Sequence, residues 1–128
     1  MSMLNIPIRT HGVIDYTVGI LLIGSPVVIQ YPDDPMKGIA VVLGAIVLLY
    51  SVMTDYPLGL LRFVPFPIHR GADLLAGGGL LFAPIHFAVH GIPAVLFVAL
   101  GAVLVSLAFL TRGQFSPTGQ DNPVVPGA

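Results

Sequence analysis

The chain has 128 residues, of which 55% are hydrophobic and 9% are charged, and its formal net charge at pH 7 is -1. Soluble domains are about 25% charged, so this composition and a mean hydropathy of +0.95 indicate one membrane domain over residues 1–128. The weak negative charge argues against nucleic-acid binding, which needs a basic face. The absence of cysteine excludes disulfides, thiolate metal sites and a cysteine nucleophile.

Four segments are long enough to cross a bilayer, which takes about 20 residues of helix. In chain order, the apolar runs predict helices over about residues 10–31, 36–54, 68–89 and 93–111. Residues 74–111 contain no formally charged residue and are too long for a single span, and His90-Gly91-Ile92-Pro93 divides this run between the last two helices. The sequence therefore predicts an all-α integral membrane four-helix bundle.

The chain contains an internal repeat. The pattern His-x3-Asp-x3-Gly-x6-Pro begins at His11 and again 58 residues later at His69. The second halves match at an offset of 57, where Leu43-Gly44-Ala45 and Thr54 correspond to Leu100-Gly101-Ala102 and Thr111. This pattern predicts two tandem two-helix repeats, over about residues 7–56 and 67–112, and a C-terminal tail over residues 113–128. Because each repeat has two helices, both insert the same way up, and we expect the axis relating them to lie along the membrane normal.

The distribution of basic residues predicts the orientation in the membrane. Four arginines lie at the end that holds both termini and the central connector, and Lys37 alone lies at the other end: Arg9, Arg62, Arg70 and Arg112. This bias favours a multi-pass protein of the inner (cytoplasmic) membrane with both termini in the cytoplasm. The connector over residues 55–67 is mostly apolar, so we expect it to lie on the membrane surface with Tyr56, Phe63 and Phe66 at the headgroup level.

Each repeat places a histidine and an aspartate one turn apart on the same helical face. These residues, with Arg70 nearby, form the predicted polar interhelical cluster: His11, Asp15, His69, Arg70 and Asp73. The favoured interpretation is a clasp that docks the two repeats, because polar residues often hold membrane helices together. The alternatives are a proton-handling cluster, a metal site of two histidines and two aspartates, and a haem between His11 and His69. The sequence favours no cofactor, and we assign no metal ligand and no catalytic residue from it.

His86 and His90 are also four residues apart, near the other end of the bundle. No matching histidine occurs on another predicted helix at that depth, which weakens the interpretation as a b-type cytochrome. Small residues let helix backbones approach closely in lipid. We therefore predict helix-packing roles for the glycines of the third helix and for those repeated in the second and fourth: Gly77, Gly78, Gly79, Gly44 and Gly101.

Residues 9–16, followed by Gly24-Ser25-Pro26, resemble the SPW-repeat family of small prokaryotic integral membrane proteins. That family is built from two copies of a two-helix unit, each marked by Ser-Pro-Trp near the end of its first helix. Here Ser25-Pro26-Val27 and Ala83-Pro84-Ile85 stand in those places, so both tryptophans and the second serine are replaced. Residues 49–56 also look like the junction in relatives with a His-Gly-x-x-Asp variant. The resemblance covers about residues 5–112 and implies the architecture, but no activity.

Three functions remain open from the sequence. The favoured one is a non-enzymatic structural or accessory subunit of a membrane assembly, in contact with membrane lipids and with other subunits or a second copy. The alternatives are a haem-, pigment- or metal-binding subunit using His11 and His69, and a small proton-coupled transporter using Asp15 and Asp73. A transporter usually binds its substrate near the membrane midplane, and no predicted helix carries an ionisable residue at that depth. An enzyme is not expected, because the sequence contains no nucleophile–base pair at helical spacing and no soluble domain that could close over a substrate.

Overall fold

The protein folds into four helices in the computed structural model, which describes residues 6–31 and 34–111. The helices are α1 (Ile8–Val28), α2 (Asp34–Met53), α3 (Phe66–His86) and α4 (Ile92–Leu110). Their ends lie within a few residues of the predicted ones, and the all-α four-helix bundle is confirmed. The predicted tail over residues 113–128 lies outside the described residues.

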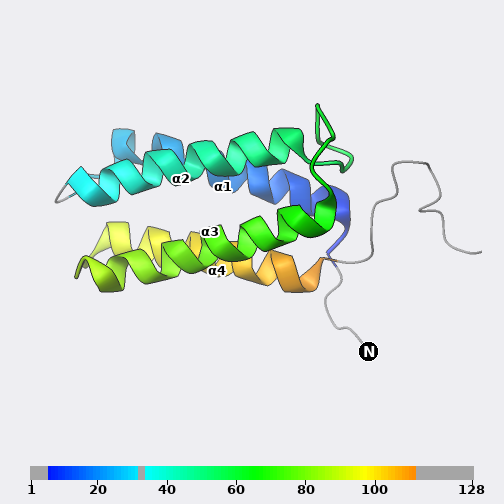
Figure 1. The fold of residues 1–128 in the computed structure, drawn as a ribbon. Helices are drawn as coiled ribbons and strands as arrows, with labels where there is room; N and C mark the ends of the chain where they lie inside the picture. Colours follow the sequence, from blue (N-terminus) through cyan, green and yellow to red (C-terminus); the bar gives the residue numbers. More distant parts are fainter. Residues whose placement is uncertain (1–5, 32–33, 112–128) are drawn as a thin grey trace, which may run out of the picture.

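The four helices run up and down, so the connector and both ends of the described chain lie at the same end of the bundle (Figure 1). Most interhelical contacts join α1 to α2 and α3 to α4, and α2·α3 and α1·α4 contacts close the bundle. Two short backbone bridges lie at the connector end: Ile6 pairs with Thr111, and Val64 pairs with Thr54. The start of α1 therefore meets the end of α4 in the same way that the start of α3 meets the end of α2.

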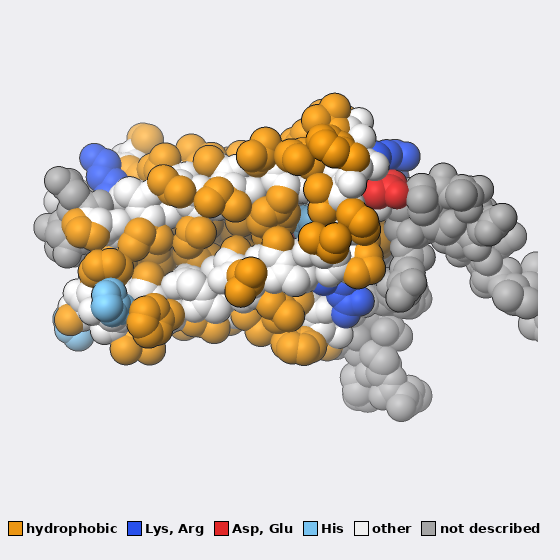
Figure 2. Space-filling model, in the orientation of Figure 1, with side chains coloured by type: hydrophobic (Ala, Val, Ile, Leu, Met, Phe, Trp, Pro, Cys, Tyr) orange, Lys and Arg blue, Asp and Glu red, His pale blue; other side chains and the backbone are white. Residues whose placement is uncertain are grey.

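The bundle has the composition of a membrane protein. Among the described helices, α1, α2 and α4 are long and apolar enough to cross a bilayer. The fourth, α3, has the same 21-residue length as α1 and lies beside the others (Figure 1). It falls short in hydropathy because it carries His69, Arg70, Asp73 and a run of glycines. Hydrophobic side chains cover the visible length of the bundle, and charged side chains lie at its ends (Figure 2).

Apolar side chains fill the space between the helices. Leu22, Val47, Leu80, Phe97 and Leu104 are fully buried. In lipid the outer apolar side chains face an equally apolar solvent, so burial alone contributes little to helix association. Close packing and polar contacts must therefore hold the helices together.

Glycines bring the two helices of each repeat into backbone contact. A Cβ atom on Gly44 would lie 2.8 Å from the carbonyl oxygen of Gly19, and one on Gly77 or Gly101 would lie 2.8 Å from the carbonyl oxygen of the other glycine. These contacts join α1 to α2 and α3 to α4 at corresponding positions, because neither helix presents a side chain at the crossing.

The expectation that Gly78 and Gly79 also pack against a helix is wrong. Both are exposed, and a Cβ atom on either would meet no atom within 4 Å. Successive residues of an α-helix point about 100° apart. A run of three glycines therefore cannot face one neighbouring helix, and only Gly77 faces α4.

The glycine contacts predict a difference between neighbouring substitutions. Gly77→Ala should destabilise the bundle by about 1–3 kcal/mol, because the new methyl group overpacks the α3–α4 crossing. Gly78→Ala gains the same helix propensity without the clash, so its melting temperature in detergent should equal or exceed that of the wild type. Equal melting temperatures for the two variants would contradict the crossing at Gly77.

Candidate functional site

Two histidines and two aspartates form a closed ring between α1 and α3. The His–Asp ring consists of His11, Asp15, His69 and Asp73, all fully buried. His11 Nε2 lies 2.7 Å from Asp73 Oδ2, and His69 Nε2 lies 2.6 Å from Asp15 Oδ2. Within each helix the corresponding distances are 3.1 Å for His11–Asp15 and 3.3 Å for His69–Asp73. The two Nε2 atoms and the two Oδ2 atoms therefore alternate around the ring.

The shortest contacts of the ring connect the two repeats. The spacing of four residues in the sequence suggested that each histidine contacts the aspartate of its own helix. The structure retains those contacts, but each histidine makes its shorter contact with the aspartate of the other repeat. The ring can therefore act as an interhelical clasp, because separating α1 from α3 breaks both short contacts.

Two threonines fix the orientation of the histidine rings. His11 Nδ1 contacts the hydroxyl of Thr111, and His69 Nδ1 lies 2.6 Å from that of Thr54. Each threonine already donates its proton to the carbonyl four residues earlier, at Leu107 and at Tyr50. A hydroxyl has a single proton to donate, so each threonine accepts a hydrogen bond from Nδ1–H. In the sequence, these threonines are visible only as residues repeated at an offset of 57.

The threonine contacts determine the charge balance of the ring. With hydrogen on both Nδ1 atoms and no further proton, two neutral imidazoles and two carboxylates would carry two negative charges. One proton in each short Nε2–Oδ2 contact makes the set neutral. Net charge buried in a membrane is costly, and a buried ion pair is tolerated only when its geometry and remaining hydrogen bonds are good. The closed ring provides this geometry if two protons are shared among its four groups, and every ring nitrogen and carboxylate oxygen except Asp15 Oδ1 has a hydrogen-bond partner.

The two aspartates of the ring differ in the partner of Oδ1. The Tyr50 hydroxyl donates a hydrogen bond of 2.5 Å to Asp73 Oδ1. Asp15 Oδ1 is buried and has no hydrogen-bond partner among the described residues. The residue that corresponds to Tyr50 in the second repeat, 57 positions later, is Leu107. The missing hydroxyl of the second repeat therefore explains the unsatisfied oxygen of the first aspartate.

Two aromatic side chains cover the ring at the connector end. Phe66 stacks on His69, with ring centroids 5.6 Å apart, and meets His11 edge-on at 5.1 Å. The ring centroid of Tyr56 lies 5.2 Å from that of His69. Burial raises the pKa of the Tyr56 hydroxyl above its usual value, so this cover stays uncharged.

The position of Tyr56 corrects a sequence prediction. We expected Tyr56 and Phe66 at the headgroup level, but both are buried. The connector folds back on the end of α2, where Leu60 and Val64 donate backbone hydrogen bonds to the carbonyls of Val52 and Met53. This fold turns Tyr56 inward and leaves other apolar side chains of the connector exposed, including Phe63.

Arg70, which we placed in the polar cluster, lies outside the ring. Its guanidinium donates to the carbonyl of Ala108 from Nε at 2.9 Å and from Nη2 at 2.6 Å. Arg70 follows His69 directly, so its side chain leaves α3 about 100° away from that of the histidine. It satisfies one of the last carbonyls of α4, which have no partner within their own helix.

His86 and His90 do not form a helical pair. His86 is the last residue of α3, and Ala88 and Gly91 have positive φ values of 53° and 79° in the turn that follows. Both histidines are exposed, and they lie at the end of the bundle opposite the His–Asp ring.

The geometry of the ring disfavours haem or pigment ligation by His11 and His69. Both Nε2 atoms face carboxylate oxygens, and the imidazole centroids are 5.3 Å apart in an edge-to-face arrangement. A planar macrocycle ligated by both histidines would have to lie between these rings. The aspartates already occupy that space.

The threonine contacts predict that a substitution at Thr54 lowers stability and that the same substitution at Thr17 does not. Thr54→Val keeps the shape of the side chain but leaves His69 Nδ1–H buried without an acceptor, which should cost about 1–3 kcal/mol. Thr17→Val removes a similar bond to the carbonyl four residues earlier at an exposed position, and should change stability by less than about 0.5 kcal/mol. Thermal melts in detergent compare the two variants. Equal effects would mean that Thr54 does not support the ring.

Comparison with known proteins places the chain in a family. The family model described as SPW repeat domain matches residues 9–111, which include all four helices except the first residue of α1. The match also spans the whole His–Asp ring and both of its threonines. No curated protein and no solved structure matches the chain. The resemblance noted at residues 9–16 thus extends over most of the sequence, and the chain belongs to the SPW repeat family.

Proposed function

We propose that this protein is a non-enzymatic structural or accessory subunit of an assembly in the inner membrane, with both termini in the cytoplasm. The observation that carries the proposal is the His–Asp ring. Four ionisable side chains of the described helices are fully buried, and they contact one another across the bundle. They hold the repeats together, and the lateral surface on the face that Figure 2 shows is largely apolar.

The alternative functions have weaker support. A proton-coupled transporter needs its carboxylates to reach water, whereas Asp15 and Asp73 are fully buried and lie beneath Tyr56 and Phe66. An enzyme needs a space in which a substrate meets its catalytic groups. The same buried carboxylates and imidazoles are the strongest candidates for such groups, and they are already bonded to one another.

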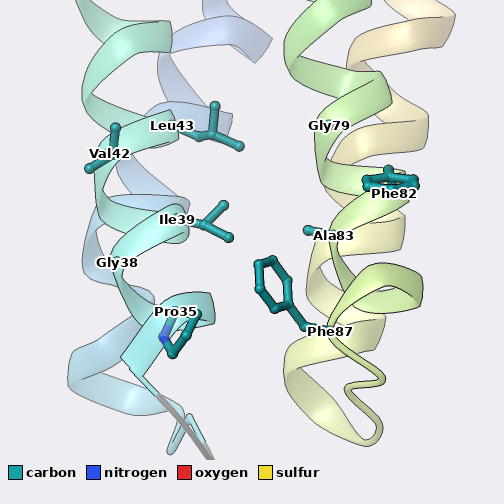
Figure 3. Close-up of a pocket in the computed structure, with 9 residues that line it drawn as sticks. All are labelled: Pro35, Gly38, Ile39, Val42, Leu43, Gly79, Phe82, Ala83 and Phe87. Carbon is teal, nitrogen blue, oxygen red and sulfur yellow. The ribbon is translucent and has the colours of Figure 1, made fainter.

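A groove between α2 and α3 offers a surface for a partner. It has a volume of about 540 Å³ and an almost wholly apolar lining, and it lies at the end of the bundle opposite the ring. Ile39 and Leu43 point into it from α2, and Phe87 projects toward α2 from below α3 (Figure 3). Gly79 lines its α3 side and is exposed, and a small residue at this position lets a second membrane helix approach closely. We propose an apolar transmembrane helix of another subunit as its occupant.

Filling the groove should release the partner without unfolding the bundle. Gly79→Leu places a large side chain in the groove, and Gly78→Leu places the same side chain on α3 outside its lining. Neither glycine has an atom within 4 Å of an added Cβ, so both variants should melt like the wild type. We expect cross-linking in native membranes to capture a complex with wild type and Gly78→Leu, and at least tenfold less with Gly79→Leu. A wild-type protein that remains monomeric in its native membranes would contradict the subunit role.

Reporter fusions test the proposed orientation. The arginine bias toward the connector end predicts that a C-terminal fluorescent reporter is active and that a C-terminal alkaline phosphatase is inactive. A phosphatase inserted at the α1–α2 turn should be active, because that turn lies at the opposite end of the bundle (Figure 1). The reverse pattern would overturn the orientation and leave the fold unaffected.

A further inference from the structure

The His–Asp ring has the donor set of a closed metal site. Its four residues supply two imidazole nitrogens and two carboxylate oxygens, and all four atoms lie within 4.8 Å of one another. Zinc bonds to nitrogen and oxygen are about 2.0–2.2 Å long, so the donors of a tetrahedral site lie roughly 3.4 Å apart. Neighbouring donors in the ring are 2.6–3.3 Å apart. Each donor therefore has to move by less than about 1 Å to surround one ion.

The surroundings of the ring orient these donors as metal ligands are oriented. Metal-bound histidines usually donate the hydrogen of their second ring nitrogen to an oxygen, which fixes the tautomer and directs the other nitrogen at the metal. His11 and His69 do this through Thr111 and Thr54. Carboxylate ligands are in turn held by hydrogen bonds, as Tyr50 holds Asp73. Both Nε2 atoms are thus directed into the ring.

Asp15 Oδ1 is a second, independent indication of a ligand. This atom is buried without a hydrogen-bond partner among the described residues, and the side chain that carries it is fully buried. An unsatisfied buried oxygen costs about 1–3 kcal/mol, more when it is charged. A cation bound at Oδ2 would also lie near Oδ1 of the same carboxylate and would offset this cost.

We propose that the His–Asp ring binds one divalent transition-metal ion, with Zn²⁺ as the best match to two imidazoles and two carboxylates. The ion takes the place of the two protons shared in the Nε2–Oδ2 contacts. Two protons leave as one doubly charged ion enters, so the ring stays neutral in the membrane. Tyr56 and Phe66 cover the ring, so the ion enters while the repeats dock or when the cover opens. The inference deepens the proposed structural role and rests on the clasp.

Metal analysis of the full chain tests the inference. The protein is produced with added zinc, purified in mild detergent, dialysed and analysed for metals. We expect about one zinc ion per chain in the wild type and at least tenfold less in Asp15→Asn, which keeps the side-chain shape but removes its charge. The matched control is the double variant His86→Gln/His90→Gln, which removes the exposed histidines and should retain the zinc. Growth with Co²⁺ should give the visible absorption of a four-coordinate nitrogen and oxygen site.

A second variant and a wild-type measurement keep the test valid if Asp15→Asn fails to fold. Thr54→Val keeps all four donors and should bind zinc about 10–100-fold more weakly in competition with a chelator. The melting temperature of the zinc-free wild type should rise with zinc concentration, because the ion binds the folded state. A folded wild type with less than about a tenth of a zinc ion per chain, or zinc that is lost with His86 and His90, would overturn the inference. If Thr54→Val still destabilises that zinc-free protein, only the metal proposal fails and the clasp stands.

Discussion

The contact between the two repeats through the His–Asp ring is the interaction on which the bundle depends. Apolar side chains gain little by leaving lipid for the interior of a membrane protein, so the many leucines and valines do not specify how the repeats dock. The docking is specified by the contacts of His11 with Asp73 and of His69 with Asp15. They join α1 to α3 at one depth, and a shift of either helix would leave carboxylates buried without partners.

Two kinds of contact hold the bundle at two levels. Within each repeat, paired glycines bring the helix backbones together at Gly19–Gly44 and at Gly77–Gly101. Between repeats, the polar ring fixes the docking near the connector, and the groove separates α2 from α3 at the other end. The repeats are therefore joined most firmly where the ring lies. This arrangement keeps the groove at the end of the bundle opposite the ring.

Much of the architecture could be predicted from the sequence, because the lengths of the apolar runs, the prolines and the repeat offsets of 58 and 57 residues report on local structure. The contacts between side chains of different helices could not be predicted from the sequence. The spacing of His11 and Asp15 places them on one face but does not identify their neighbour across the bundle. Arg70 and Gly78 each lie one residue from a buried position, yet a rotation of about 100° takes them out of the contact. Tyr56 shows the same limit, since an aromatic residue in an apolar connector suits either the membrane surface or the interior.

The unequal surroundings of Asp15 and Asp73 distinguish the fused repeats from a symmetric dimer of single repeats. In a symmetric dimer of two-helix units both aspartates would have equivalent surroundings, because each unit would supply the same side chains. Fusion allows the copies to diverge, and Tyr50 and Leu107 differ at corresponding positions. One carboxylate is then held by a tyrosine while the other keeps a free oxygen. A buried oxygen without a hydrogen-bond partner is costly, so its presence at Asp15 favours the proposal that the ring binds a cation.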